Sequence, residues 1–342
     1  MGSVLILTKG TDGVPLAHHL AACGSVVKVV FENSNYTNVL VGLPNPSVIS
    51  TLKMLEQYDL ILDTGSQSSD LVQSEGHSIL GGCAIGRRLL EDPLYLEKVL
   101  RLVGCKQWQG NGADPTAINL LLTGWFNGKE FSFFTLSLLY NRLCEGEKGR
   151  VVGSMGRVTY STKSSPLTQG TVEKMKEFFT KVKYQGPITC SCLLTETEVF
   201  IKKVSTTFFP LEVFELYKGK DFEMLWKLKL QQEIELKDEY ALCSKLVIEE
   251  ANGTTLIKVG GPAFPHVCYQ DLKGDCTSSL SGPIVCLVTA RSPQVFEARR
   301  RVQRTIRNIV VSKDIQYRND IGNDADSLIQ RISEWEVVNA TA

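Results

Sequence analysis

Short apolar runs alternate with segments of helical periodicity in the first third of the chain. The apolar runs predict three strands, and the periodic segments predict three helices. The predicted strands are Val4–Thr8, Val26–Phe31 and Tyr58–Asp63, and the predicted helices are Val14–Cys23, Ser47–Gln57 and Asp92–Val103. Because strands that alternate with helices form parallel sheets, this region predicts an N-terminal parallel α/β domain.

Strand-like runs dominate beyond Gly110. They predict strands at Phe131–Leu139, Pro187–Leu194, Glu198–Val204, Leu242–Glu249, Thr255–Val259 and Ile284–Ala290. Helical spacing returns at Leu167–Val182, Leu211–Lys229 and Pro293–Asn308. We predict three domains from this change of pattern: an N-terminal domain at 1–108, a core at 109–235 and a C-terminal α+β domain at 236–342.

Two glycine-containing segments are candidate ligand sites. Gly10 and Gly13 lie between the first strand and its helix, where backbone N–H groups can hold a phosphate; the alternative is an ordinary βα turn. The segment Gly146–Gly156 is predicted to be a loop. Its candidate residues are Gly149, Arg150, Gly153, Ser154, Met155 and Gly156. Glycines let the backbone approach a ligand closely, and Arg150 can pair with a phosphate; the alternative is a flexible hairpin.

No catalytic signature is complete in this sequence. The first glycine turn is not a full G-x-G-x-x-G, and there is no Walker A motif. The four histidines, His18, His19, His77 and His266, lie outside any nucleophile signature.

Charge is balanced along the chain, with 37 basic and 37 acidic residues. A net charge of zero gives no general signal for nucleic acid or an anionic membrane. One segment is locally basic, with Arg299, Arg300, Arg301, Arg304 and Arg307. It is interpreted as a solvated helix face, and an anion or partner site is the alternative.

The ten cysteines show no paired zinc spacing. Strand alternation predicts that Cys190 and Cys192 share one face, and we expect reduced, buried thiols. No secretory signal and no apolar stretch of membrane-spanning length is found. These features predict a soluble, cytoplasmic protein.

Several motifs appear in the order typical of one known family. The opening strand and glycine turn, Asn127–Ser132, Gly149–Gly156, Tyr184–Gly186 and the final Tyr317–Gly322 carry the resemblance. Tyr317–Gly322 resembles the family motif Y-R-x-D-I-G, and Gly149–Gly156 resembles the family motif G-P-N-T-G-G-M-G. The chain thus resembles the phosphoribosylamine–glycine ligases, which are ATP-grasp enzymes. Members of that family make glycinamide ribonucleotide from phosphoribosylamine, glycine and ATP-Mg in purine biosynthesis.

The resemblance also identifies departures from the family. A small lobe that carries an ATP-contacting lysine and a glycine-rich lid has only Gly104–Thr123 in its place. Thr123 and Gly124 align with an acidic hinge pair. Ile201, Lys203 and Ser205 align with the metal glutamate, the metal asparagine and an arginine. Isoleucine has no oxygen to offer Mg²⁺, and an ammonium group repels the ion.

These departures predict a reduced ATP-grasp core without the lid lobe. The first hypothesis is a degenerate ligase homologue that binds a phosphoribosyl or nucleotide-like ligand or a protein partner, needs no cofactor and binds no nucleic acid or membrane. The second is an active ATP-dependent amide-forming ligase that uses ATP-Mg, with Lys203 replacing the charge of the metal. The third is a structural or assembly protein, for instance a homo-oligomer, that reuses the fold. Arg318 and Asp320 are candidate ligand residues by motif and are interpreted as parts of a retained domain.

Overall fold

The structure is a computed structural model that describes residues 2–36, 39–40, 45–50, 52, 55–110, 116–207, 211–248, 257–259, 266–271 and 283–340. Parts of three predicted elements, at Thr51, Lys53–Met54, Glu249 and Thr255–Leu256, lie outside the described residues. None of the helices within these ranges is long and apolar enough to cross a membrane.

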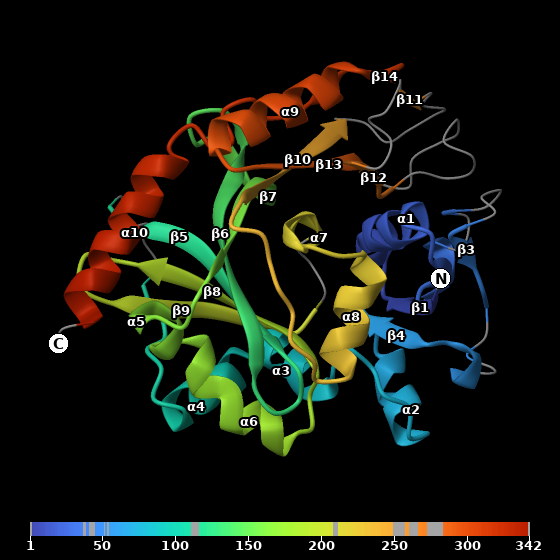
Figure 1. Cartoon of the computed structure of the whole chain (residues 1–342), viewed down its shortest axis with the longest axis horizontal. Coiled ribbons are helices and arrows are strands. Elements are labelled where there is room, and N and C mark those ends of the chain that lie inside the picture. Colours follow the sequence, from blue (N-terminus) through green and yellow to red (C-terminus); the bar gives the residue numbers. More distant parts are fainter. Residues whose placement is uncertain are drawn as a thin grey trace.

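A small parallel sheet is formed by the first part of the chain (Figure 1). Its strand order is β3 (Ser47–Val48), β2 (Val26–Phe31), β1 (Ser3–Thr8) and β4 (Leu60–Asp63). Short helices connect these strands: η1 (Thr11–Gly13), α1 (Val14–Ala22), η2 (Ser34–Tyr36) and η3 (Leu55–Gln57); α2 (Ser68–Ser74) follows β4. All three strand pairs are parallel, which confirms the predicted parallel α/β region.

The predicted helix at Ser47–Gln57 is wrong. Ser47 and Val48 pair with β2 as an edge strand, and the Ile49 amide donates to the Val29 carbonyl at 3.0 Å. Only η3, at the end of that segment, is helical. The β-branched side chains of Val48 and Ile49 suit a half-buried sheet surface better than a helix.

A large antiparallel sheet forms the rest of the molecule. Along its main path the order is β12 (Val267–Tyr269), β13 (Ile284–Ser292), β10 (Tyr240–Ile248), β7 (Lys148–Thr162), β6 (Phe131–Cys144), β5 (Ile118–Phe126), β8 (Gly186–Leu194) and β9 (Val199–Ser205). β15 (Ile315–Gln316) pairs with β10, and β11 (Ile257–Val259) pairs with β14 (Ile309–Val311). β5 was not predicted, and residues 103–117 alone connect it to the preceding helix.

One hydrophobic core joins the large sheet to its helices. These helices are α3 (Ala84–Glu91), α4 (Pro93–Leu102), α5 (Pro166–Gln169), η4 (Val172–Met175), α6 (Lys176–Lys181), α9 (Val295–Arg307) and α10 (Ala325–Ala340). Leu96, Phe179 and Val302 are members of this core. The predicted helix Leu167–Val182 breaks into three pieces near Gly170. The domain boundary at 108 stays a prediction, and α3 and α4 share the core of the sheet that follows it.

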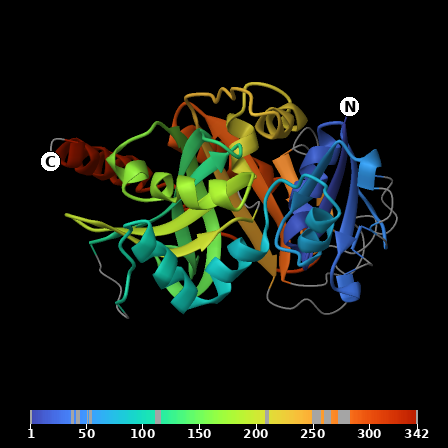
Figure 2. The same ribbon diagram turned by 90° about the horizontal axis from the view of Figure 1, so that it is seen from below.

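A second core includes residues of both sheets, which lie side by side in Figure 2. It contains residues of α1, α7 (Glu212–Leu216) and α8 (Asp221–Lys229), together with Trp125 and Cys243 from the large sheet. The predicted helix Leu211–Lys229 is interrupted at Tyr217–Lys220, where Gly219 packs against the Tyr217 ring. This core holds the first turn of the small sheet next to β7 and β10.

Candidate functional site

Two adjoining cavities lie where the small sheet meets the large sheet. The smaller has a volume of about 200 Å³, and the larger about 550 Å³. Asp12, Gly153 and Arg157 border both cavities, which are therefore adjacent and are called the joined cavities below. The larger cavity lies within the range of roughly 300–1,000 Å³ that is typical of small-molecule sites.

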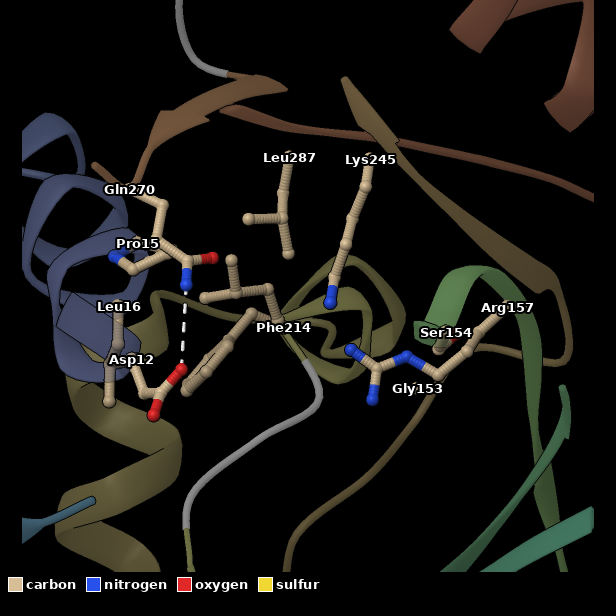
Figure 3. Close-up of a pocket in the computed structure, with 11 residues that line it drawn as sticks. Asp12, Pro15, Leu16, Gly153, Ser154, Arg157, Phe214, Lys245, Gln270 and Leu287 are labelled. Atoms are coloured by element: carbon tan, nitrogen blue, oxygen red, sulfur yellow. Dashed lines mark hydrogen bonds between the residues drawn. The ribbon is translucent and has the colours of Figure 1, made fainter. Parts of the chain in front are cut away.

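Arg157 and Lys245 place two positive charges in the smaller cavity (Figure 3). Arg157 comes from β7, and its Nε lies 2.8 Å from Oε1 of the buried Glu212 on α7. Thr159 donates to the same carboxylate oxygen at 3.2 Å. Because the ion pair engages Nε, the two terminal guanidinium nitrogens remain directed at the cavity (Figure 3).

Lys245 projects from β10 toward Arg157 (Figure 3). Burial lowers the pKa of its ammonium group, and the charge of Arg157 lowers that pKa further. Within the described residues, the side-chain ammonium group of Lys245 has no hydrogen bond or ion pair. An ammonium group that is partly buried beside a second cation is stabilised by a bound anion.

Asp12 faces these cations from the turn that follows β1. Burial raises the pKa of its carboxyl group, while Lys245 acts in the opposite direction. Gln270 donates to Asp12 Oδ1 at 3.4 Å. The turn is tightly packed at Gly13, where a Cβ would lie 2.7 Å from Thr64 Oγ1 and 2.9 Å from Thr8 Cβ. Glycine at this position therefore allows Asp12 to approach the large sheet.

A bulge in β9 determines what faces the larger cavity. Lys203 pairs with Ser191 and Ile201 pairs with Cys192, so the register shifts between them at Lys202. Ile201 is 0% exposed in the hydrophobic core, whereas Lys203 lines the cavity. Hydroxyl groups surround Lys203, from the cavity-lining residues Thr189, Ser191, Ser205, Thr206 and Thr207.

Positive charge predominates around the joined cavities. Their lining residues include the cations Lys9, Arg87, Arg157, Lys203 and Lys245 and the carboxylates Asp12 and Glu91. Mg²⁺ prefers several oxygen ligands in octahedral geometry. The residues aligned with the family's metal ligands do not fit this ion, because Ile201 lies in the core and Lys203 contributes a positive charge.

The predicted glycine loop is a strand with a wide bulge. Tyr140 pairs with Gly156 and Arg142 pairs with Val151, so residues 152–155 of β7 lie outside the ladder. Gly153, with a φ of +90°, is in this bulge and lines both cavities. The prediction of a loop at 146–156 is therefore corrected to strand β7 beyond the turn at 145–147.

The structure brings some predicted site residues together and separates others. Gly153 and Ser154 line the smaller cavity, Gly153 and Lys203 line the larger one, and Gly10 and Gly13 belong to the adjacent turn without lining either. Met155 is buried, and a Cβ on Gly156 would lie 2.1 Å from Ile321 Cδ1. Gly149 and the exposed Arg150 belong to the far end of the hairpin, where Arg142 donates to the Gly149 carbonyl at 2.8 Å.

Arg318 and Asp320 lie away from the cavities and bind each other. Arg318 Nε donates to Asp320 Oδ1 at 2.8 Å and Nη2 donates to Oδ2 at 2.7 Å. Arg318 also pairs with Glu147, and the Gly146 amide donates to Asp320 at 2.8 Å. The two residues thus connect the C-terminal segment to the turn between β6 and β7.

Sequence reasoning missed five residues of the site: Lys9, Asp12, Arg87, Arg157 and Lys245. Lys9 and Asp12 belong to the glycine turn that was singled out, where attention went to the backbone alone. Lys245 stands alone in an apolar strand, and this isolated charge was the available signal. Arg87 is fixed by hydrogen bonds to the Ser66 carbonyl at 2.8 Å and Ser69 Oγ at 2.9 Å, which no sequence pattern indicates.

Solved structures share this architecture at low sequence identity. Phosphoribosylamine–glycine ligase from Thermotoga maritima has a TM-score of 0.69 and 14% identity, with 93% of this chain and 100% of that chain covered. Biotin carboxylase from Campylobacter jejuni, solved as a β,γ-ATP complex, has a TM-score of 0.61, 11% identity and 94% coverage of each chain. Urea carboxylase from Kluyveromyces lactis has a TM-score of 0.62 and 12% identity; the match covers 91% of this chain and 30% of the urea carboxylase.

No protein-family model and no curated protein sequence matches this chain. The resemblance to phosphoribosylamine–glycine ligases in particular therefore stays a prediction. Identities of 11–14% establish the fold alone. The parallel sheet, the antiparallel sheet and these structural matches agree with the predicted fold class, and the chain has an ATP-grasp-like fold.

Proposed function

We propose that this protein binds a small phosphorylated ligand of the phosphoribosyl type in the joined cavities and does not catalyse ligation. The observation that carries the proposal is the pair of cations Lys245 and Arg157 in the smaller cavity; the charges of Asp12 and Glu212 act on Lys245, but no described residue forms an ion pair with its ammonium group. Arginine and lysine bind phosphate through charge-assisted hydrogen bonds, which are stronger than neutral ones.

The rest of the lining supports a sugar phosphate. Hydroxyl groups of Thr189, Ser191 and Ser205 face the larger cavity beside Lys203. Such groups exchange hydrogen bonds with sugar hydroxyls. Asp12 offers acceptor oxygens at the junction of the two cavities, where a ribose hydroxyl could donate to them.

Two features support the loss of ligase activity. Ile201 occupies the position that aligns with the metal glutamate, and its side chain is in the core. Residues 103–117, between α4 and β5, are too few to form the lobe that closes over nucleotide in the family this chain resembles. Phosphoryl transfer depends on a metal that neutralises developing charge and on two-sided positioning of the phosphate.

Calorimetry with ribose 5-phosphate tests the binding proposal. We expect ribose 5-phosphate to bind the native chain saturably. Ribose, which lacks the phosphate, should not bind. Lys245→Met removes the charge while keeping an unbranched side chain, and should weaken binding about tenfold to a hundredfold, equivalent to about 1.5–3 kcal/mol. Lys181→Met, at an exposed lysine on α6, is the matched control and should bind like the native chain. Equal affinity in both variants would remove Lys245 from the site.

An activity assay tests the second half of the proposal. We expect no ATP hydrolysis that depends on phosphoribosylamine and glycine, with or without Mg²⁺. Turnover that requires all three substrates would overturn the loss of activity and leave the binding result standing.

An active ligase is the second candidate, and the exposure of Lys203 in the larger cavity favours it. In that case Lys203 would supply charge to a nucleotide phosphate. ATP binding that is lost in Lys203→Met would support this candidate, whereas undetectable ATP binding would count against it.

A further inference from the structure

Three side chains that can bind metal converge between α1 and α8. His19 and Cys23 are four residues apart at the end of α1, and Asp221 is the first residue of α8. His19 Nε2 lies 3.0 Å from Asp221 Oδ2, and Cys23 Sγ lies 2.8 Å from the same oxygen. All three donor atoms lie within 4.8 Å of one another.

The imidazole of His19 is buried without a complete set of hydrogen bonds. His19 is 6% exposed; its Nδ1 has no hydrogen-bond partner among the residues that the structure describes, and its Nε2 lies 3.0 Å from Asp221 Oδ2 without hydrogen-bond geometry. The Phe214 ring packs on it with centroids 5.3 Å apart. A buried polar group without a partner is costly, and such an atom directed at a carboxylate and a thiol points to a missing ligand.

The surroundings favour a cation at this position. The Glu215 carboxylate interacts electrostatically with both Cys23 and His19, so it adds a second negative charge to that of Asp221. Two positive groups lie near Glu215: His266 Nδ1 is 2.9 Å from Glu215 Oε1, and Lys237 Nζ donates to the Glu215 carbonyl at 3.3 Å.

We propose that His19 Nε2, Cys23 Sγ and an Asp221 carboxylate oxygen bind one Zn²⁺-type divalent ion that joins α1 to α8. Zinc accepts nitrogen, sulfur and oxygen ligands in tetrahedral geometry with bonds of roughly 2.0–2.3 Å. The His19 and Cys23 ligand atoms would each have to move away from the Asp221 oxygen by less than about an ångström to reach that geometry. The Cys23 thiol transfers its proton to solvent when the thiolate binds the ion.

One coordination position would remain for water. Cys23 is exposed, so solvent reaches the ion from that side. Phe214 contacts His19 and also lines the smaller cavity, so the metal site and the cavity are neighbours with separate ligands. The inference does not depend on the proposed phosphate binding.

Cobalt substitution tests this site in the full-length protein. Titration with Co²⁺ should produce a thiolate-to-cobalt absorption band that saturates at one equivalent and is abolished by Zn²⁺. Cys23→Ser should lose the band and weaken Zn²⁺ binding by at least about a hundredfold. Cys144→Ser, at another exposed thiol, is the matched control and should keep both.

Asp221→Asn provides a second variant with nearly unchanged shape, and it should weaken binding while the circular dichroism spectrum stays native. Zn²⁺ should raise the melting temperature of the native chain and of Cys144→Ser, but not of Cys23→Ser. The proposal is overturned by the absence of a saturable band in the native chain, or by an unchanged band in folded Cys23→Ser.

Discussion

Arg318, near the C-terminal end of the chain, forms ion pairs although its side chain is almost completely buried. Its side chain is 1% exposed and contacts Asp320, Glu147 and the ring of Tyr140. Burial alone would raise the pKa of Asp320, but the hydrogen bonds and charge of Arg318 and the Gly146 amide hold that pKa below its ordinary value. These contacts assign the motif to stability.

We therefore expect Arg318→Met to lower the free energy of unfolding by about 3 kcal/mol at neutral pH, because it leaves a largely buried carboxylate unpaired. A depressed pKa contributes stability above the unfolded value of about 3.9 and loses it as the pH falls through the folded pKa. The difference between native chain and variant should thus shrink below about pH 4. Urea unfolding at several pH values measures it.

Arg307→Met is the matched control, at an exposed arginine near the end of α9, and should change stability by less than about 0.5 kcal/mol. Equal losses in the two variants, or a loss that is the same at pH 3 and pH 7, would contradict the structural role of Arg318.

The sequence alone predicted the surroundings of some residues and not of others. Alternation predicted that Cys190 and Cys192 share a face, and both are fully buried in one core, which confirms the prediction. The same reasoning did not find Arg157, because its buried partner Glu212 is distant in sequence. Pairing between distant residues is decided by tertiary structure, which local patterns do not contain.

Strand β9 shows how one inserted residue changes the role of a position. The bulge at Lys202 directs Ile201 into the core and Lys203 into the cavity, although both have odd numbers in one strand. Simple alternation predicts that they share a face. The sequence therefore predicted the strand and the preceding strand β8. The side of the sheet to which each side chain of β9 points could be found only from the structure.

The bulge leads to a prediction about restoring the family's metal glutamate. Ile201→Glu should lower the free energy of unfolding by about 4 kcal/mol, because the carboxylate enters the hydrophobic core. Mg²⁺ should not recover this loss. Lys203→Glu, which faces the cavity, is the control and should cost less than about 1 kcal/mol. Denaturant unfolding with and without Mg²⁺ measures both, and Mg²⁺-dependent recovery of Ile201→Glu would show that the residue faces a metal site.

The whole molecule consists of a small parallel sheet and a large antiparallel sheet with a shared core. The alternation of apolar runs with helical segments predicted the parallel sheet, because that sheet type depends on local periodicity and connection length. The antiparallel pairing of the large sheet was not predicted. The joined cavities were not predictable in this way. Their lining comes from the turn after β1, from α3 and from β7, β9 and β10, which only the packing of the two sheets brings together.

This arrangement predicts that a bound sugar phosphate stabilises both sides of the cavity at once. Hydrogen exchange with saturating ribose 5-phosphate should slow at the turn around Asp12, at the bulge around Gly153 and at β10 around Lys245, since a ligand that binds the native state reduces local opening wherever it makes contact. α10 and the turn at 145–147 line neither cavity and should exchange at unchanged rates. Lys245→Met, at the same ligand concentration, should reduce the protection on both sides. Slower exchange confined to one sheet would mean that the ligand does not bridge them, and the phosphate would then have to bind at a surface of that sheet alone.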